Sequence, residues 1–360
     1  MRKLVFIFII SLSLSWLLTF LMQHVALKNR ILSWPGRRKI HTKPVPYLGG
    51  IAIYLTFLVA TVVVLYTNQQ FKIQFFHKLK GLLTGGIIIV ALGLWDDIRD
   101  IRPIIKFIGQ VAVALLLFAY GFRVDILTNP FFADNIQLPL FLSILITVMW
   151  IVGLVNAMNF IDGLDGLAAG MTFIICGALS LVSLYLGNHI NVFLLTVLAG
   201  CVLGFLFFNF PPAKIFMGDS GSMFIGLVLA SVALIGLQHK SATAVVLLVP
   251  VTVLGIPIYD IFMAVIRRTL KKKSIFKADK KHLHHRLLNT GLKQKEIVLF
   301  MCLITLYLGV FSFLFVLIPE KYAFILLILL ALGLFMGTKT IVFIEKRAKV
   351  IRRLKLKSQK

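Results

Sequence analysis

Side chains able to hold a metal ion or accept a proton are concentrated in the stretch NAMNFIDGLDGLAAG, residues 156–170. Asn156, Asn159, Asp162 and Asp165 recur there at every third position, between two long apolar runs. Polar groups left without partners in hydrocarbon are costly, so four of them at the end of an apolar run need a reason. A plain polar turn between two membrane helices would also use Asn, Asp and Gly. Acids elsewhere in the chain favour a functional site over such a turn.

The carboxylates of the chain gather at three similar junctions. Six of the ten Asp residues lie at positions 96, 97, 100, 162, 165 and 219, and the three Glu residues lie elsewhere. The neighbours Asp96 and Asp97 repel each other unless a cation lies nearby. Asp219 belongs to the run GDSGS at a predicted helix start, where backbone N–H groups attract anions. A simple capped helix start is the alternative interpretation of that run.

The elements that must position these residues are membrane helices. The chain has 360 residues, of which 59% are hydrophobic, and a membrane span needs about 20 apolar residues. We predict an all-α, polytopic membrane bundle of about eleven transmembrane helices, which forms one domain over residues 1–360. The predicted spans are 4–27, 47–67, 82–95, 104–121, 138–155, 167–187, 191–208, 221–237, 242–264, 297–318 and 322–344.

The distribution of Lys and Arg predicts the orientation of these spans. If the loop 28–46 is cytoplasmic, the loops and tail on its side carry 28 of these residues and the opposite side carries eight. The positive-inside rule then places the N-terminus outside and the C-terminus in the cytoplasm. The loop 265–296 and the tail 345–360 become basic cytoplasmic segments, and all three acidic junctions lie on the same side. Arg2 and Lys3 resemble the start of a signal peptide, but the long apolar run after them favours an uncleaved first span.

The basic face suits phosphorylated substrates and anionic lipid headgroups, in keeping with the net charge of +25. The largest loop contains His282, His284, His285 and Arg286. Two His residues could ligate zinc, but no Cys or nearby Glu completes the set, and phosphate binding fits better. Lys43 lies in a second basic segment, for which phosphate binding and simple membrane anchoring are about equally favoured.

The predicted span 242–264 should be broken, because it contains Pro250, Gly255 and Pro257. Such a break would open a groove toward lipid. Asp260 follows the break, and we favour a charge pair with Arg267 or Arg268 over a direct role with substrate.

Carboxylates on a basic membrane face indicate chemistry on phosphates. Magnesium is commonly held by one or two carboxylates together with substrate phosphates. Phosphoryl transfer needs little more from a protein than positioning and charge neutralisation. The residues therefore predict a magnesium-dependent reaction of a phosphorylated substrate at the cytoplasmic membrane surface. A transporter would place ionisable groups near the membrane midplane in repeated halves, and a scaffold without catalysis would not need intact acidic motifs.

The chain resembles the polyprenyl-phosphate N-acetylhexosamine-1-phosphate transferases over nearly its whole length. The matching stretches are PYLGG from Pro46, Asp96-Asp97, NAMNFIDGLDGLAAG from Asn156, FNFPPAKIFMGDSGS from Phe208 and HLHHR from His282. The resemblance implies transfer of a sugar 1-phosphate from a UDP-sugar to undecaprenyl phosphate at the bacterial inner membrane. UMP would be released, and the product would be the first lipid-linked intermediate of a cell-envelope glycan. HLHHR and VPYLGG resemble the branch that uses UDP-N-acetylglucosamine rather than the branch that uses UDP-N-acetylmuramoyl-pentapeptide.

The resemblance also implies roles for single residues. Asp219 resembles the main magnesium ligand, with Asn159 as a second, and manganese could replace magnesium. Asp96 and Asp97 resemble the pair near the metal, one of which would deprotonate the lipid phosphate, and Asp162 would lie at the centre. The expected substrate-binding residues are Lys43, Asn156 and His282, then Gly163, Leu164 and Asp165 (with uridine), Phe216 (on uracil), and His284, His285 and Arg286 (on pyrophosphate or sugar). Direct attack and a covalent Asp intermediate both stay open. Membrane lipids are expected partners, a homodimer is an option, and nucleic acid is not expected.

Overall fold

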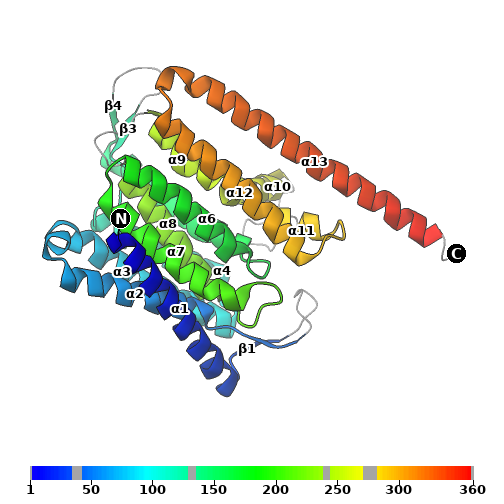
Figure 1. Cartoon of the computed structure of the whole chain (residues 1–360), viewed down its shortest axis with the longest axis horizontal. Coiled ribbons are helices and arrows are strands. Elements are labelled where there is room, and N and C mark those ends of the chain that lie inside the picture. Colours follow the sequence, from blue (N-terminus) through cyan, green and yellow to red (C-terminus); the bar gives the residue numbers. More distant parts are fainter. Residues whose placement is uncertain (1, 35–42, 129–134, 238–243, 271–281, 358–360) are drawn as a thin grey trace.

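The computed structural model describes residues 2–34, 43–128, 135–237, 244–270 and 282–357. These parts of the chain are almost entirely helical (Figure 1). The helices are α1 (Arg2–Lys28), α2 (Gly49–Thr67), α3 (Gln69–Arg99), α4 (Pro103–Ala119), α5 (Leu140–Ile161), α6 (Leu167–Tyr185), α7 (His189–Asn209), α8 (Gly218–Leu237), α9 (Ala244–Val253), α10 (Gly255–Leu270), α11 (Leu283–Leu288), α12 (Gln294–Leu317) and α13 (Ala323–Lys357), with a 3-10 turn at Glu320–Tyr322.

Two short antiparallel pairs of strands complete the described structure. β1 (Leu32–Ser33) pairs with β2 (Val45–Pro46), and β3 (Ile126–Thr128) pairs with β4 (Asn135–Gln137). The first pair follows α1 and leads into α2, while the second connects α4 to α5.

Within the described ranges, nine helices are long and apolar enough to cross a membrane, namely α1, α2, α3, α5, α6, α7, α8, α12 and α13. The other two predicted spans are shorter helices. α4 has 17 residues, and the span 242–264 consists of α9 and α10, which meet at Leu254. The predicted break is confirmed by the end of α9 at Val253 and the start of α10 at Gly255. It arises because Pro257 has no N–H to bond the carbonyl of Val253. The polytopic helical class therefore agrees with the prediction, while the number of crossings stays a prediction.

Several helices extend beyond the apolar stretches that predicted them. α3 begins at Gln69 rather than at residue 82. In the predicted loop 265–296, α10 continues to Leu270, and α11 and the start of α12 follow after the gap. α13 continues through Lys357, so most of the predicted tail is helical. Hydropathy marks only the membrane-buried part of a helix, whereas Lys, Gln and Arg continue the helix into water.

α8 lies at the centre of the bundle and packs against α2, α3 and α5. Glycines permit the closest contacts: a Cβ on Gly50 would collide with the backbone of Gly221, and a Cβ on Gly93 with the backbone of Ser220. Gly50 at the start of α2 thus lets α2 and α8 come into close contact. These contacts bring the ends of α2, α3 and α8 together.

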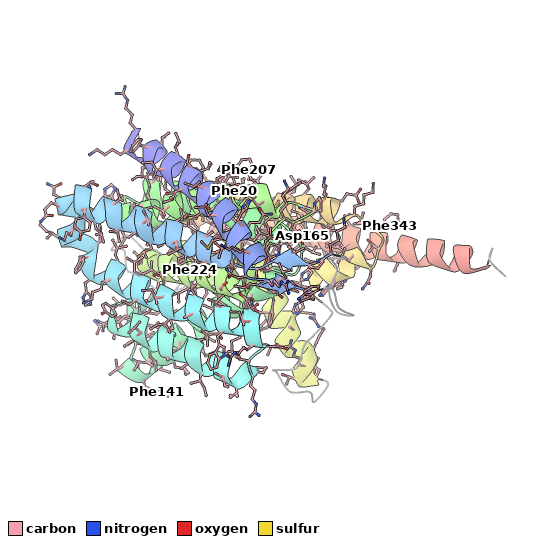
Figure 2. The ribbon with its side chains drawn as sticks, turned by 90° about the horizontal axis from the view of Figure 1, so that it is seen from below. Phe20, Phe141, Asp165, Phe207, Phe224 and Phe343 are labelled. Carbon is pink, nitrogen blue, oxygen red and sulfur yellow. The ribbon has the colours of Figure 1, made fainter. Side chains whose placement is uncertain are left out.

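One end of the bundle collects the motifs. α3, α5 and α7 end there, and α2, α6, α8 and α12 begin there. Figure 2 shows Asp165 at this end, the same end beyond which α13 projects. α13 itself lies along the edge of the bundle beside α12 (Figure 1). Many of its apolar side chains are exposed.

Candidate active site

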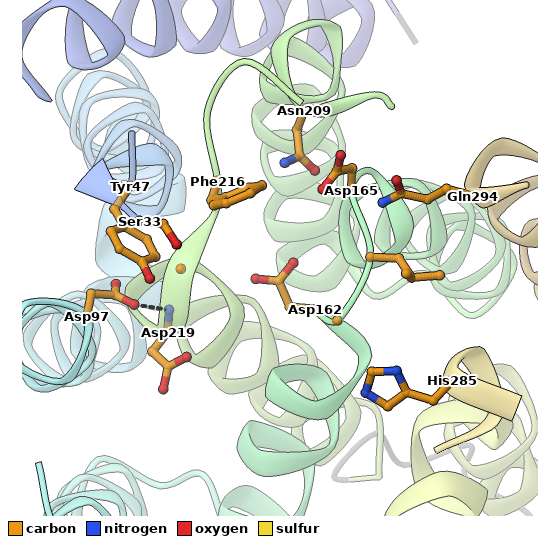
Figure 3. A pocket seen from close by; sticks show the side chains of 13 residues that line it. Ser33, Tyr47, Asp97, Asp162, Asp165, Asn209, Phe216, Asp219, His285 and Gln294 are labelled. Atoms are coloured by element: carbon orange, nitrogen blue, oxygen red, sulfur yellow. Dashed lines mark hydrogen bonds between the residues drawn. The ribbon is translucent and has the colours of Figure 1, made fainter. Parts of the chain in front are cut away.

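A cavity of about 330 Å³ lies where these helix ends meet (Figure 3). Its lining residues are Ser33, Tyr47, Asp97, Asp162, Gly163, Leu164, Asp165, Asn209, Phe216, Gly218, Asp219, His285 and Gln294. Eight of the fifteen predicted site residues are among them. We call this space the polar cavity. Three of the carboxylates that define it come from different helix junctions, as the sequence predicted.

Two of the sequence motifs are joined through their backbones on one wall. The N–H of Phe216 donates to the carbonyl of Pro46 at 2.8 Å, and the N–H of Gly50 donates to the carbonyl of Met217 at 2.9 Å. The chain after β2 therefore runs beside the segment that leads into α8. This pairing places Tyr47 and Phe216 together, with ring centroids 6.3 Å apart. The predicted uracil-stacking ring, Phe216, thus borders the cavity.

Asp97 caps α8 from a different helix. Its Oδ1 accepts the backbone N–H of Asp219 at 2.8 Å, and its Oδ2 accepts the backbone N–H and the hydroxyl of Ser220 at 3.2 and 3.1 Å. The first N–H groups of a helix have no partner inside the helix, and they favour a negative charge. Gly218 allows the approach, since a Cβ there would collide with the Asp97 carboxylate. The orientation of Asp97 is therefore fixed by the start of α8.

Lys106, near the start of α4, is a site residue that the sequence analysis missed. Its ammonium binds the Asp96 carboxylate at 3.0 Å and also the Asp219 carboxylate. Asp96 in turn accepts the backbone N–H of Ile101 at 2.9 Å. The expected cation near the Asp pair is thus a lysine that bridges to the third acidic motif. The sequence feature that could have identified Lys106 is its position as a single Lys one turn into an otherwise apolar helix.

Asp162 occupies the turn between α5 and α6, and its carboxylate points into the polar cavity (Figure 3). Burial raises the pKa of this carboxyl well above its usual range, and the charge of Asp219 raises it further. Within the described parts of the chain, no hydrogen bond to the Asp162 carboxylate is found. Without a cation in the cavity, burial thus favours the protonated form of Asp162, and a bound cation would favour the carboxylate.

The wall that contains Asp165 is tied together by side chains. Asp165 accepts the backbone N–H of Ala213 at 3.0 Å. Asn209 accepts the N–H of Gly166 at 2.8 Å and donates to the carbonyl of Ile215 at 2.9 Å. These bonds fasten the turn after α5 to the segment that leads to α8. Asn209 is a second residue whose position in the cavity wall the sequence analysis missed.

The HLHHR motif divides among several environments. His285 lines the polar cavity, whereas His284 is buried behind Gly163, whose Cβ, if present, would collide with the imidazole. Burial, followed by the nearby His285, lowers the pKa of His284 to about 3, so its ring is neutral. Among the described residues neither of its ring nitrogens has a hydrogen-bond partner.

Besides His284, four predicted substrate-binding residues do not line the polar cavity as far as the structure describes it. Asn156 lies deeper along α5 and donates to Gln110 at 2.6 Å. Lys43 is exposed before β2. His282 is buried against Asp260, and Arg286 faces a different cavity. One helical turn, or one residue in a short helix, is enough to change the direction of a side chain.

The two remaining predicted residues lie at the edge of the site. Asn159 donates to the hydroxyl of Ser222 at 3.0 Å, and Ser222 lies one turn after Asp219 in α8. Asp96 is held by Lys106 as described. Both are next to the Asp219 carboxylate rather than in the cavity wall itself.

A second, larger cavity of about 540 Å³ is lined mainly by apolar residues of α10, α12 and α13. We call it the apolar cavity. Ile256 and Tyr259 contribute from α10, Tyr307 from α12 and Gly337 from α13, with Arg286 of α11 as its charged residue. The sequence predicted a groove toward lipid beside the broken span, and this cavity lies there.

The donor set suits magnesium better than zinc. In the described residues, no group of three or more His, Cys, Asp or Glu side chains is close enough to hold a metal ion by itself. Magnesium does not need such a group, because waters and substrate phosphates complete its shell around one or two carboxylates. Asp219, with Asp162 across the cavity, offers oxygen ligands of that kind.

These features define a class of protein: a multi-pass helical membrane protein with a carboxylate-rich polar cavity and a separate, mainly apolar cavity. Residues 79–237 match the family described as glycosyl transferase family 4. The chain is 38% identical over 306 residues to a probable undecaprenyl-phosphate N-acetylglucosaminyl 1-phosphate transferase of Bacillus subtilis, covering 84% of this chain and 82% of that relative.

Two further relatives are similar to this chain at lower identity. A decaprenyl-phosphate N-acetylglucosaminephosphotransferase of Mycobacterium leprae is 35% identical over 335 residues, 87% of this chain and 83% of the relative. A phospho-N-acetylmuramoyl-pentapeptide-transferase of Thermoanaerobacter sp. is 32% identical over 282 residues, 74% and 83% of the two chains. The chain therefore belongs to glycosyl transferase family 4, as the motifs predicted, and is a phosphoglycosyl transferase.

Proposed function

We propose that this enzyme transfers N-acetylglucosamine 1-phosphate from UDP-N-acetylglucosamine to a polyprenyl phosphate, with undecaprenyl phosphate as the acceptor. The observation that carries the proposal is the meeting of Asp97, Asp162 and Asp219 in one cavity beside an apolar cavity. The sugar assignment is supported by the higher identity to the two N-acetylglucosaminyl relatives than to the muramoyl-pentapeptide relative. Transfer of phospho-N-acetylmuramoyl-pentapeptide is the alternative.

The reaction balances without a further reactant. An oxygen of the lipid phosphate attacks the phosphorus that carries the sugar, and the bond between that phosphorus and the bridging oxygen breaks. UMP leaves with the bridging oxygen, and the sugar 1-phosphate becomes part of a lipid diphosphate. Such transfers depend mostly on positioning and on neutralising charge.

Magnesium would be held by Asp219, with the Asn159 amide beside it and Asp162 facing it. When bound, the ion would neutralise the charge of the donor diphosphate. The proposal is supported by the position of Asp162 in the cavity, by the raised pKa that burial and neighbouring acids give it without a cation, and by the oxygen donors that these residues offer. Manganese is an alternative ion of similar ligand preference.

The walls of the polar cavity suggest where the donor lies. Phe216 offers a ring for the uracil, and Gly163, Leu164 and Asp165 line the cavity near it. His285 lies at the far side of Asp162, where a diphosphate or sugar could reach it (Figure 3).

The apolar cavity is proposed to receive the prenyl chain. Its lining is apolar along α10, α12 and α13, and Arg286 gives it a cationic residue suited to the lipid phosphate. The resemblance implied that Arg286 binds the pyrophosphate or sugar of the UDP-sugar. The present proposal assigns Arg286 to the phosphate of the lipid acceptor instead. A prenyl chain is far longer than one cavity, so only its phosphate-proximal part would lie there.

The base that deprotonates the lipid phosphate is assigned to the Asp96–Asp97 pair. Asp97 lines the polar cavity, and its hydrogen bonds to α8 hold its carboxylate in a constant orientation. Direct attack is preferred to a covalent Asp intermediate, because the two cavities let both substrates bind at once.

The 28 to 8 distribution of Lys and Arg supports an active site on the cytoplasmic side of the cell inner membrane. A homodimer stays a prediction.

The test is a panel of UDP-sugars offered to the detergent-purified protein with undecaprenyl phosphate and magnesium, followed by identification of the lipid product. We expect UMP and a lipid-linked N-acetylglucosamine, and no UMP from the Asp219→Ala variant. Consumption of UDP-N-acetylmuramoyl-pentapeptide instead would establish the alternative. Near-normal turnover of Asp219→Ala would remove the metal assignment.

A further inference from the structure

Asp260 of α10 is buried and outside both proposed reaction sites, yet both of its oxygens bind the start of α11. Oδ2 lies 3.0 Å from Nδ1 of His282, and Oδ1 accepts the backbone N–H of Leu283 at 3.1 Å. Asp260 is 2% exposed and His282 is 5% exposed. The structure pairs Asp260 with His282, a partner that the sequence analysis did not consider, and the charge pair with Arg267 or Arg268 stays a prediction. Arg268 lies over the ring of Phe160, 5.8 Å from its centroid.

α11 depends on such anchors because it has only six residues. Isolated helices of that length do not form in water, since nucleation is unfavourable. Its own N-cap residue, His282, makes no capping hydrogen bond with its side chain. Asp260 supplies the missing acceptor from another helix, and Phe160 packs on the His282 ring at 5.0 Å.

The position of α11 decides what its histidines can reach. His284 fills the space behind Gly163, and His285 lines the polar cavity. The rings of His284 and His285 are 4.3 Å apart, so a shift of α11 would move both. A change at Asp260 should therefore alter the polar cavity through His282 and α11.

We propose that Asp260 is a positioning residue, which holds α11 so that His285 faces the sugar nucleotide in the polar cavity. The nature of that ligand rests on the proposed function, but the placement of α11 does not. A purely structural Asp260 would affect the stability of the whole bundle and leave substrate affinities unchanged.

The variants are Asp260→Ala, which loses both interactions, and Asp260→Asn, which keeps a carbonyl acceptor for Leu283. Phe262→Leu is the matched control, because Phe262 is an exposed residue of the same helix. We expect Asp260→Ala to raise KM for the UDP-sugar by about tenfold, Asp260→Asn to raise it less, and KM for undecaprenyl phosphate to stay within about twofold. The control should match the wild type. Equal KM values in all variants, or a rise confined to the lipid, would overturn the proposal.

A double-mutant cycle tests the route of the effect. If Asp260 acts through His282, the Asp260→Ala/His282→Ala variant should be no worse in UDP-sugar KM than the more impaired single variant. Multiplicative losses would mean that Asp260 acts by another route, which would contradict the proposal.

A final measurement needs no substrate. Diethylpyrocarbonate modifies accessible neutral imidazoles, and His284 is neutral but only 1% exposed. Mass spectrometry should find His284 protected in the wild type and in Phe262→Leu, and modified about ten times faster in Asp260→Ala. Equal protection in Asp260→Ala would overturn the positioning role even if the UDP-sugar assay succeeds. Loss of protection in a protein that uses no UDP-sugar would support the positioning role and refute the proposed function alone.

Discussion

The carboxylate of Asp97, near the end of α3, accepts the backbone N–H of Asp219 at the start of α8 at 2.8 Å. The two residues are 122 positions apart in the chain. This bond joins two of the three acidic motifs and makes the site depend on the packing of α3 against α8.

Asp97 should have separable structural and chemical roles. Asp97→Ala removes the acceptor of three hydrogen bonds and should lower stability by about 2 kcal/mol, as loss of a charged helix cap does. Asp97→Asn keeps one acceptor oxygen but turns an amide NH2 group toward a donor, so it should lose less stability than Asp97→Ala while UMP release falls at least about 100-fold. Thermal unfolding and turnover of the two variants separate the structural role from the chemical role. Ser220→Ala is the control that removes only the hydroxyl donor to Asp97. An active Asp97→Asn enzyme would restrict Asp97 to capping.

Lys106 should act as the resident counter-ion of Asp96 and Asp219. Lys106→Met leaves two partly buried carboxylates without their cation, which should cost about 2 kcal/mol of stability without magnesium. Added magnesium should then raise the melting temperature more in this variant than in the wild type, because the ion alone neutralises the pair. Melting curves with magnesium and with a chelator provide the comparison, and Lys106→Arg is the charge-keeping control. An identical response of all three proteins to magnesium would argue against the counter-ion role.

The contact between Gly163 and His284 predicts a second-site suppressor. Gly163→Ala places a methyl group against the His284 imidazole, which is buried and cannot move aside cheaply. Activity should fall about tenfold or more as the turn that holds Asp162 shifts. When His284 is already alanine, the added methyl group has room, so Gly163→Ala should reduce activity less in the His284→Ala protein than in the wild type. Turnover of the three variants tests the contact, and a double variant with purely multiplicative losses would speak against it.

His284 should make the protein sensitive to acid. Its pKa is lowered to about 3 in the fold from an ordinary value of 6.5. Between these values the unfolded chain binds the additional proton, so stability is kept above pH 6.5 and lost as the pH falls below it. The loss at pH 5 should be about 2 kcal/mol. Unfolding of the wild type and of His284→Gln at pH 7 and pH 5 checks this, and the variant should lose less. An equal loss in both proteins would show that other groups dominate.

Filling the apolar cavity should affect only the lipid substrate. Gly337 lines this cavity and has open space around its Cβ position, so Gly337→Leu can be accommodated by occupying the cavity. KM for undecaprenyl phosphate should rise about tenfold, with the KM for the UDP-sugar unchanged. Gly177→Leu in α6 is the matched control, because Gly177 has similar open space outside the cavity. If Gly337→Leu and Gly177→Leu behave alike, the prenyl chain does not use this cavity.

Local patterns in the sequence were sufficient for the class of protein and for the motifs. Apolar runs long enough to span a bilayer, broken by a proline-bearing segment, predicted the helices, since hydropathy is a property of the chain itself. The grouping of Asp96, Asp162 and Asp219 on one face followed from counting crossings, and the family followed from the motifs.

Only the tertiary structure decided which side chains of these motifs meet. Neighbouring positions in a helix differ in direction by about 100 degrees, and motif letters carry no information about which face packs inward. Asn156 therefore turned out to pair with Gln110, while Arg286 faces the apolar cavity and His285 the polar one. Lys106 and Asp260 have partners far away in the chain, and such pairings depend on how whole helices pack together.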